Sequence, residues 1–345
     1  MTLASGERGS PARRLATLAL VLLAACRPGP PPSRPLVLGA PTLPSLGLLD
    51  VARFGGERGR AGARVERRAY QSGRAALDAL LAGQVDLAAC YDMAFVVAAL
   101  SHPELRVLTS LHHASAGTVI VTRRGGGVAR PEDLRGRRVG VPRDTSADFF
   151  LETLLRFAGV PTGEVERVDL APEAAAAALA RGEVAAVAIW YPQARKVREA
   201  LPPGEALEIT SDVHTEVSML VVRADVLAAR DAEVRAVVRA LSEAEWLVQR
   251  RPDEAFAALR RAFPGEREDD LREDWARARP ELGLRNAMLA VLEREARWVL
   301  RERGRPGPGP DFRELFAQGP LTAADPEAVT VYPALPPPLE EGDAP

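Results

Sequence analysis

The stretch that decides the fold runs from residue 132 to residue 160 and reads Glu-Asp-Leu-Arg-Gly-Arg-Arg-Val-Gly-Val-Pro-Arg-Asp-Thr-Ser-Ala-Asp-Phe-Phe-Leu-Glu-Thr-Leu-Leu-Arg-Phe-Ala-Gly-Val. It predicts a strand at Arg138–Val141, a polar turn, and a helix at Ala147–Ala158. Asp144, Thr145 and Ser146 in the turn are residue types that begin helices well. Such a helix start can hold a small polar or anionic ligand, because its backbone N–H groups are free. An ordinary strand–helix unit with a good cap is the simpler interpretation.

The same alternation of strands and helices continues along most of the chain. It predicts an α/β fold with two lobes, each a mostly parallel sheet flanked by helices. The predicted strands are Pro35–Gly39, Val65–Tyr70, Val85–Ala89, Arg106–Leu111, Thr118–Thr122, Val165–Leu170, Val184–Trp190, Glu208–Thr210 and Ser218–Val222. The further predicted helices are Leu46–Phe54, Gly73–Ala82, Met93–Leu100, Pro172–Arg181, Ala232–Gln249, Pro252–Ala262 and Leu284–Arg303.

The N-terminus has the pattern of an export signal. Two arginines precede the apolar run from Leu15 to Ala25, which is too short to span a bilayer comfortably and fits a signal-peptide core. The run ends in Leu-Ala-Ala before Cys26, which resembles the lipobox of bacterial lipoproteins, where the cysteine is acylated. We therefore expect residues 1–25 to be a lipoprotein signal peptide and residues 26–35 a proline-rich tether to a bacterial membrane. A plain secretory signal with a chance cysteine is the alternative.

Composition narrows the classes of protein. The formal net charge is −2, with 45 Lys and Arg against 47 Asp and Glu, so no basic nucleic-acid surface is expected. Cys90 is the one cysteine besides Cys26, so an intrachain disulfide is not possible if Cys26 is acylated. Glycines and prolines follow Gly304, and we expect residues 305–345 to form a proline-rich, largely disordered tail.

Three segments, in order along the chain, resemble one protein family. They are Leu77–Ala88, which contains Gly-Gln-Val-Asp; Glu132–Val160; and Ala178–Pro192, which ends in Trp-Tyr-Pro. Together they are similar to the signature segments of the ABC-transporter substrate-binding proteins for nitrate, taurine, aliphatic sulfonates and pyrimidine precursors of thiamine. The likeness spans residues 36–304, nearly all of the chain after the tether.

This resemblance implies the type II periplasmic binding protein fold, with a ligand cleft between two lobes that close by hinge rotation. It also implies that the chain crosses between the lobes near His112–Gly117 and near Asp212–Val217. Lobe 1 would then comprise residues 36–115 and 212–304, and lobe 2 residues 116–211.

Motifs for catalysis are not evident. The sequence has neither a Walker-type phosphate loop nor a Gly-x-Ser-x-Gly elbow. His112 and His113 are adjacent and ill placed to share a metal ion, and His102 and His214 are isolated in the sequence. We therefore expect no enzymatic activity, no cofactor and no metal. A small-metabolite enzyme or a sensory input protein on the same fold is the alternative.

In open α/β sheets, ligands bind at the carboxyl ends of the strands. Four predicted loops lie at such ends, and one further candidate, Glu216, lies in the second proposed crossing between the lobes. Trp190 matches, by the resemblance, an aromatic position that packs on the ligand. Thr145 and Ser146 could act only as caps, Tyr91 and Trp190 could be packed rings, and Glu216 could be a solvated charge. The candidate ligand-binding residues are Thr42, Pro44, Ser45, Tyr91, Asp92, Asp144, Thr145, Ser146, Trp190, Tyr191 and Glu216.

Two of these candidates bear on the chemistry of the ligand. Asp92 and Asp144 would both border the cleft, and two carboxylates oppose an anionic ligand. We therefore expect an amine, a zwitterion or a neutral heterocycle, on which Trp190 and Tyr191 could stack. The chain is then expected to be a monomeric solute-binding lipoprotein that delivers its ligand to the permease and ATPase of an ABC importer.

Overall fold

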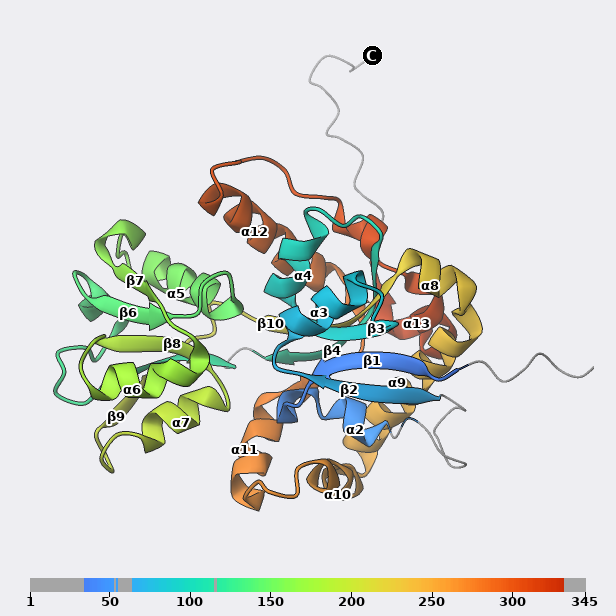
Figure 1. Ribbon diagram of the computed structural model, residues 1–345, viewed down its shortest axis with the longest axis horizontal. Helices are drawn as coiled ribbons and strands as arrows, with labels where there is room; N and C mark the ends of the chain where they lie inside the picture. Colours follow the sequence, from blue (N-terminus) through green and yellow to red (C-terminus); the bar gives the residue numbers. More distant parts are fainter. Residues whose placement is uncertain (1–33, 53, 55–63, 115–116, 332–345) are drawn as a thin grey trace, which may run out of the picture. The chain divides into compact units, whose positions relative to one another are not determined.

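The computed structural model describes residues 34–52, 54, 64–114 and 117–331. It contains a six-stranded and a five-stranded sheet, each covered by helices (Figure 1). The predicted fold class, α/β with two flanked sheets, is confirmed, but both sheets are mixed and not mostly parallel, because the strands that cross between them run antiparallel to their neighbours. Residues 1–33, which include most of the predicted export signal and tether, lie outside the described residues. Across the described ranges, every helix is too short or too polar to cross a membrane.

The first sheet has the strand order β11-β4-β10-β3-β1-β2. β1 pairs in parallel with β2 on one side and β3 on the other. The strands are parallel because α3 (Gly73–Leu81) carries the chain from the end of β2 back to the end of the sheet where β2 began. The apolar face of α3, with Ala76, Leu77 and Leu80, belongs to the same buried core as the sheet. The strands are β1 (Leu36–Pro41), β2 (Val65–Tyr70), β3 (Leu87–Tyr91), β4 (Leu105–Ala114), β10 (Glu216–Arg223) and β11 (Arg279–Pro280).

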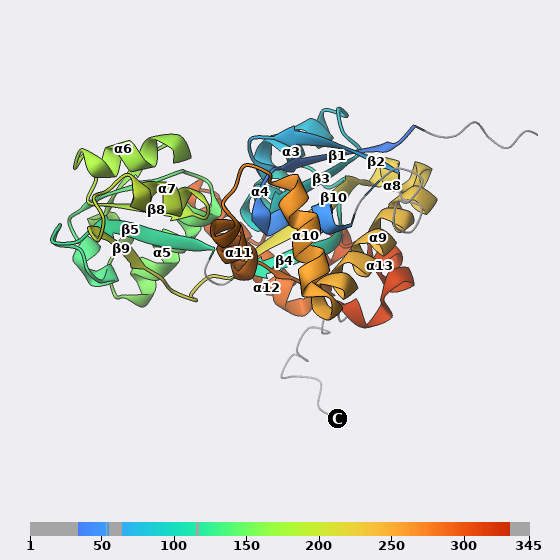
Figure 2. The same cartoon turned by 90° about the horizontal axis from the view of Figure 1, so that it is seen from below.

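The second sheet has the order β7-β6-β8-β5-β9, and helices cover both of its faces. One core cluster joins the sheet to α5, and a separate cluster joins it to α6 and α7. Figures 1 and 2 show α5 on one side of the sheet and α6 with α7 on the other. The elements are β5 (Thr118–Arg123), β6 (Arg138–Val141), α5 (Ser146–Phe157), β7 (Glu166–Asp169), α6 (Ala175–Ala180), β8 (Ala186–Trp190), α7 (Gln193–Glu199) and β9 (Ala206–Ile209).

Each sheet contains a strand that enters directly from the other sheet. β5 follows β4 and runs antiparallel to both of its neighbours, β8 and β9. β10 follows β9 and runs antiparallel to β3 and β4. Ala114, at the end of β4, and Glu216, at the start of β10, lie opposite each other in the β10–β4 register, so the two connections meet the first sheet at neighbouring positions.

The helices that follow β10 pack mainly with the first sheet. The three predicted helices after β10 correspond to α9, α10 and α12, but α8 and α11 were not predicted. α11 contains few apolar residues, and Leu271 and Trp275 are the two that pack inward. The elements are α8 (Ala224–Ala229), α9 (Asp231–Arg250), α10 (Pro252–Ala262), α11 (Glu268–Arg277) and α12 (Asn286–Glu302).

The prediction of a largely disordered tail from residue 305 is wrong for the described part of that segment. α13 (Gln318–Ala324) and β13 (Val329–Thr330) are formed, and β13 pairs in parallel with β12 (Leu284–Arg285). Phe312 is fully buried in the core of the first sheet, at a centroid distance of 6.2 Å from Phe95. Aromatic burial of this kind outweighs the low helix and strand propensity of the preceding glycines and prolines.

Candidate functional site

Asp92 is the centre of the candidate site. It is the first residue of α4 (Asp92–Ala99), directly after β3, and its side chain is fully buried. Its carboxylate accepts hydrogen bonds from the backbone N–H of Met93 at 2.8 Å and of Val217 at 2.8 Å, and from the Ser146 hydroxyl at 3.0 Å. Asp92 thus holds the start of β10 against β3. Through Ser146 it also contacts α5, which covers one face of the second sheet.

Ser146 supplies that contact from the first turn of α5. Thr145 occupies the position before the helix, but its hydroxyl donates to the carbonyl of Pro142 at 2.7 Å and does not cap α5. Ser146 points away from its own helix and donates to Asp92, 54 residues earlier in the chain. The alternative interpretation, in which these two hydroxyls act only as caps, is therefore wrong, and Ser146 links the two sheets.

Glu216 lies at the start of β10 and is buried, not solvated as the simpler interpretation held. Its carboxylate accepts a hydrogen bond from the Thr118 hydroxyl at the start of β5. A Cβ added to Gly117 would lie 2.7 Å from the Glu216 carboxylate, so the glycine leaves room for it. Thr118 is opposite Trp190 in the β5–β8 register, and Trp190, half-buried, thus stands at the strand end nearest to Glu216.

Two further polar residues at this site were not predicted from the sequence. Glu295 projects from α12 and is fully buried, and His214 lies in the connection before β10, also buried. The Nε2 atom of His214 lies 3.6 Å from a carboxylate oxygen of Glu295 and 4.0 Å from Oδ2 of Asp92. Within the described residues, neither oxygen of Glu295 nor Nε2 of His214 has a hydrogen-bond partner.

One cation and two aromatic rings border these groups. Arg294 places Nη2 3.4 Å from Nδ1 of His214, and its guanidinium lies 5.4 Å from the centre of the Phe149 ring. Phe149, on α5, meets His214 edge to face at 5.1 Å and Trp298 at 5.5 Å. The site is therefore built from both sheet layers, and α12 forms one of its walls.

Burial controls the protonation of the buried acidic cluster, by which we mean Asp92, Glu216 and Glu295. It raises the pKa of Asp92 to about 6, although the hydrogen bonds from Val217 and Met93 oppose the rise. Burial also raises the pKa of Glu216 to about 8, and the pKa of Glu295 lies well above its ordinary value because of burial and then the charge of Asp92. Near neutral pH, Glu216 therefore retains its proton unless a cation binds beside it, and burial favours the protonated form of Glu295.

The Ser45 and Tyr91 candidates form a second polar layer next to the cluster. The two hydroxyls lie 2.7 Å apart, and the Tyr91 ring meets His112 edge to face at 5.5 Å. His112 is buried, and its Nδ1 lies 2.6 Å from the hydroxyl of Ser218. Burial lowers the pKa of His112 to about 3, so this layer is uncharged around Tyr91.

Four predicted residues lie apart from the cluster. Thr42 is exposed, and Pro44 is buried in a short 3₁₀ helix, Pro44–Leu46. Asp144 is exposed at a φ of 57°, and none of the contacts among the described residues joins its carboxylate to Asp92. Tyr191 is engaged elsewhere: its hydroxyl donates to Glu208 at 2.6 Å, and the Arg277 guanidinium lies 3.8 Å from its ring centre.

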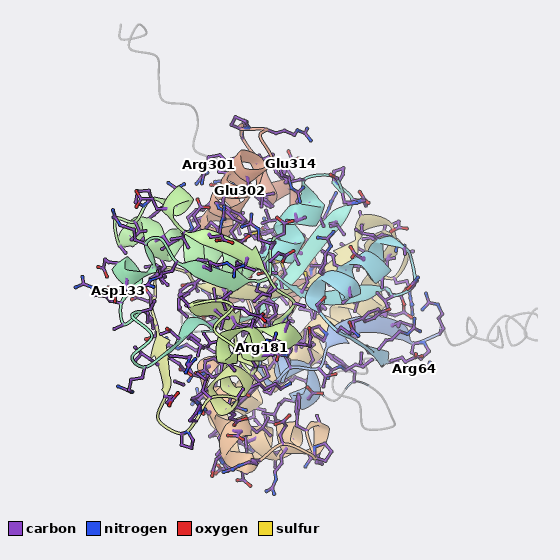
Figure 3. The ribbon with its side chains drawn as sticks, turned by 60° about the vertical axis from the view of Figure 1, so that its left-hand side comes forward. Arg64, Asp133, Arg181, Arg301, Glu302 and Glu314 are labelled. Atoms are coloured by element: carbon purple, nitrogen blue, oxygen red, sulfur yellow. The ribbon has the colours of Figure 1, made fainter. Side chains whose placement is uncertain are left out.

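α12 also contacts the second sheet's layer through charged groups near its C-terminal end. Nη2 of Arg167, on β7, lies 2.9 Å from a carboxylate oxygen of Glu302, and Figure 3 labels Glu302 next to Arg301. The indole Nε1 of Trp298 donates to Glu152 of α5 at 2.6 Å. These contacts hold α5, β7 and α12 together beside the candidate site.

A buried polar site between two α/β sheets that exchange strands is the arrangement of periplasmic binding proteins. Residues 60–255 match the family model described as "NMT1/THI5 like". The chain belongs to this family. The predicted resemblance to substrate-binding proteins of the nitrate, taurine and sulfonate group is thereby confirmed.

Known proteins support the same class. The chain is 30% identical to the taurine-binding periplasmic protein of Escherichia coli over 132 residues, 38% of this chain and 41% of that protein. The chain spans about two fifths of the length of the curated relatives it matches. The periplasmic aliphatic sulphonate binding protein SsuA of Escherichia coli has a similar structure, with a TM-score of 0.68, 20% identity, and coverage of 82% of this chain and 97% of that one. The desulfurization enzyme DszB shares the fold at a TM-score of 0.62 and 16% identity, over 85% of this chain and 99% of that one.

Proposed function

We propose that this chain is a solute-binding protein of an ABC importer, which captures a small organic molecule between its two sheets and delivers it to a membrane permease. The observation that supports the proposal best is the set of contacts around Asp92. A residue at the carboxyl end of β3 accepts a hydrogen bond from Ser146 of the other layer, and buried polar groups from β10 and α12 surround it. Ligand binding between layers is what periplasmic binding proteins use to couple capture to closure.

The ligand is proposed to carry a positive or neutral polar group and not to be a bare anion. Asp92, Glu216 and Glu295 are three buried carboxyl groups, and Arg294 is the cation beside them. An anion there would meet the carboxylate of Asp92, and at an effective dielectric of about 20 two unit charges ~4 Å apart interact by about 4 kcal/mol. An amine, a zwitterion or a neutral heterocycle fits, with Trp190 as the proposed stacking partner. The names of the relatives make an alkanesulfonate, which is an anion, and taurine, which is a zwitterion, the two ligands to compare.

Export and lipid anchoring complete the proposal. The periplasmic location stated for the taurine-binding relative supports export. The apolar run before Cys26 and the proline-rich segment after it support a diacylated N-terminus and a tether on a bacterial membrane. A monomer that meets a separate permease and ATPase is the form we propose.

Cys26 is expected to carry the lipid. Mass spectrometry of the mature protein should find an N-terminus at Cys26 with acyl chains attached, and Cys26→Ser should release the protein from membranes. A mature chain that begins elsewhere without acyl groups would contradict this part of the proposal and leave solute binding untouched.

A thermal-shift screen of amines, sulfonates, pyrimidines and vitamins tests the binding function. A true ligand at 100 times its Kd should stabilise the protein by about 2.7 kcal/mol, and X-ray scattering should show a smaller radius of gyration with it bound. Trp190→Ala should weaken binding of that ligand about tenfold or more. Because Trp190 also packs against the core of the second sheet, the substitution should lower the melting temperature of the free protein as well, and an unchanged Kd would show that Trp190 is core alone. Tight binding of nitrate or an alkanesulfonate alone would overturn the proposed ligand class.

A further inference from the structure

Three buried side chains at the candidate site contribute ligand atoms that converge on one point. Asp92, His214 and Glu295 each offer one donor atom, and these atoms all lie within 4.8 Å of one another. Both oxygens of Glu295 and Nε2 of His214 lack a hydrogen-bond partner among the described residues, although both side chains are at most 1% exposed. Buried polar atoms without partners are rare in folded proteins and indicate a place where a water, an ion or a ligand binds. We propose that Asp92, His214 and Glu295 bind a divalent transition-metal ion of the zinc class.

The spacing of these atoms is close to what such an ion requires. Zinc bonds to imidazole nitrogen and carboxylate oxygen are roughly 2.0–2.2 Å long, which separates tetrahedral ligands by roughly 3.3–3.6 Å. Nε2 of His214 lies 3.6 Å from Glu295 and 4.0 Å from Asp92. The oxygens of Asp92 and Glu295 lie within 4.8 Å of each other, so an ion that binds all three atoms must draw these two carboxylates together by rotation of their side-chain torsions.

The donor set and its support also fit this class of ion. One imidazole and two carboxylates are ligands that zinc accepts, and three protein ligands leave a coordination position open. Asp92 is held in place by the N–H groups of Met93 and Val217. These bonds orient the carboxylate and leave Oδ2 with a free lone pair. Hydrogen-bond donors behind the ligands hold carboxylates in the same way in known metal sites.

Arg294 opposes the ion and therefore gives the proposal a sharp test. Its Nη2 faces Nδ1 of His214 at 3.4 Å, but an imidazole that binds metal through Nε2 carries its proton on Nδ1. The guanidinium must then turn away, and its Nε has no partner among the described residues to hold it in place. Arg294→Gln removes the charge repulsion between the guanidinium and the ion. It also removes the guanidinium N–H group that would face the protonated Nδ1 of His214. The substitution should therefore tighten metal binding. If the site instead took an anionic or zwitterionic group, the same substitution would weaken binding.

This inference goes beyond the proposed function, because the ion would bind whether or not an organic solute follows. The open coordination position would accept an amine, a ring nitrogen or a carboxylate of the solute. The metal would thus take the place of the positive group that the proposed function assigns to the solute itself.

The experiment is calorimetric titration of the EDTA-treated full chain with Zn²⁺, Co²⁺ and, as the comparison, Mg²⁺. We expect one Zn²⁺ per chain, Co²⁺ with the visible absorption of a four- or five-coordinate ion, and no measurable Mg²⁺ binding. Glu295→Gln and His214→Ala should each raise the Kd for Zn²⁺ at least 100-fold, and Arg294→Gln should lower it. Glu295 accepts no hydrogen bond from the described residues, so Glu295→Gln is expected to fold. Glu293→Gln, on the same helix but 37% exposed, is the matched control and should change nothing.

The outcomes separate this inference from the proposed function. Failure of Zn²⁺ to bind, or binding that His214→Ala and Glu295→Gln leave unchanged, overturns the metal site. If an amine found in the thermal-shift screen still binds and loses affinity in Glu295→Gln, the acidic cluster holds the solute directly and only the metal inference fails. If neither Zn²⁺ nor any solute binds, both fail.

Discussion

Phe150→Ala is expected to destabilise the second sheet and its helices by about 3–5 kcal/mol. Phe150 is 1% exposed and packs in the core cluster between α5 and the sheet, with Leu151, Leu154 and Leu155 of the same helix. The substitution removes most of a buried aromatic ring and leaves a cavity that the surrounding strands can fill only in part. Urea denaturation followed by circular dichroism measures the loss as an earlier midpoint of unfolding.

Phe157→Ala is the matched control for this prediction. Phe157 is the last residue of the same helix, and it is 76% exposed. Its removal should change the free energy of unfolding by less than about 0.5 kcal/mol, as for most surface substitutions. Equal effects of the two substitutions would show that α5 does not hold the second sheet through this face.

The contrast between these two phenylalanines also shows what the sequence could predict. Apolar residues at helical spacing identified α5 within one residue at each end and its strand, Arg138–Val141, at the observed bounds. Burial patterns of this kind are local, so one sequence reveals them. The partner of Ser146 is not local: Asp92 lies 54 residues away in the other sheet's layer. Position in a loop at a strand end selected both residues, but only the structure joins them.

Glu295 and His214 were missed for a similar reason, although one signal was available. Glu295 lies between Leu292 and Val299 at helical spacing, so it occupies a core position of α12. A carboxylate on an apolar stripe predicts either a buried partner or a ligand. Its partner group, His214, is 81 positions earlier in the sequence and carries no local pattern. Long-range pairing of polar groups therefore limits how far sequence reasoning reaches at this site.

Arg195→Ala is expected to let the first sheet and its helices move apart from the second sheet and its helices, without unfolding either part. Arg195 of α7, beneath the second sheet, pairs with the carboxylate of Asp274 on α11, and both side chains are 6% exposed. α11 is fixed to the first sheet's layer, since a Cβ on Gly47 would lie 2.7 Å from Trp275. Removal of one partner from a buried ion pair costs about 3–5 kcal/mol while the other charge stays buried. Because the pair joins different layers, Asp274 can regain water by separation of α7 from α11.

The expected result is a larger radius of gyration for Arg195→Ala than for the wild type in X-ray scattering, with the melting temperature lowered only slightly. An energy of about 3 kcal/mol shifts the equilibrium between closed and open arrangements by more than 100-fold, so solute affinity should fall although Arg195 is not among the candidate ligand residues. Arg198→Ala is the matched control, because Arg198 is 38% exposed and pairs at 3.5 Å with Glu208 of its own sheet.

A compensated variant separates closure from folding. Arg195→Met with Asp274→Leu replaces the ion pair by apolar side chains of similar size, which is often neutral or stabilising for buried pairs. It should therefore restore the wild-type radius of gyration, whereas Asp274→Leu alone leaves Arg195 with only its longer contact to Asp270, at 3.7 Å, and should change the radius in the same direction as Arg195→Ala. If Arg195→Ala instead keeps the wild-type radius and loses several kcal/mol of unfolding free energy, α7 and α11 do not separate. The contact would then be part of a static interface, and closure of the layers on a ligand would need a hinge that leaves this pair intact.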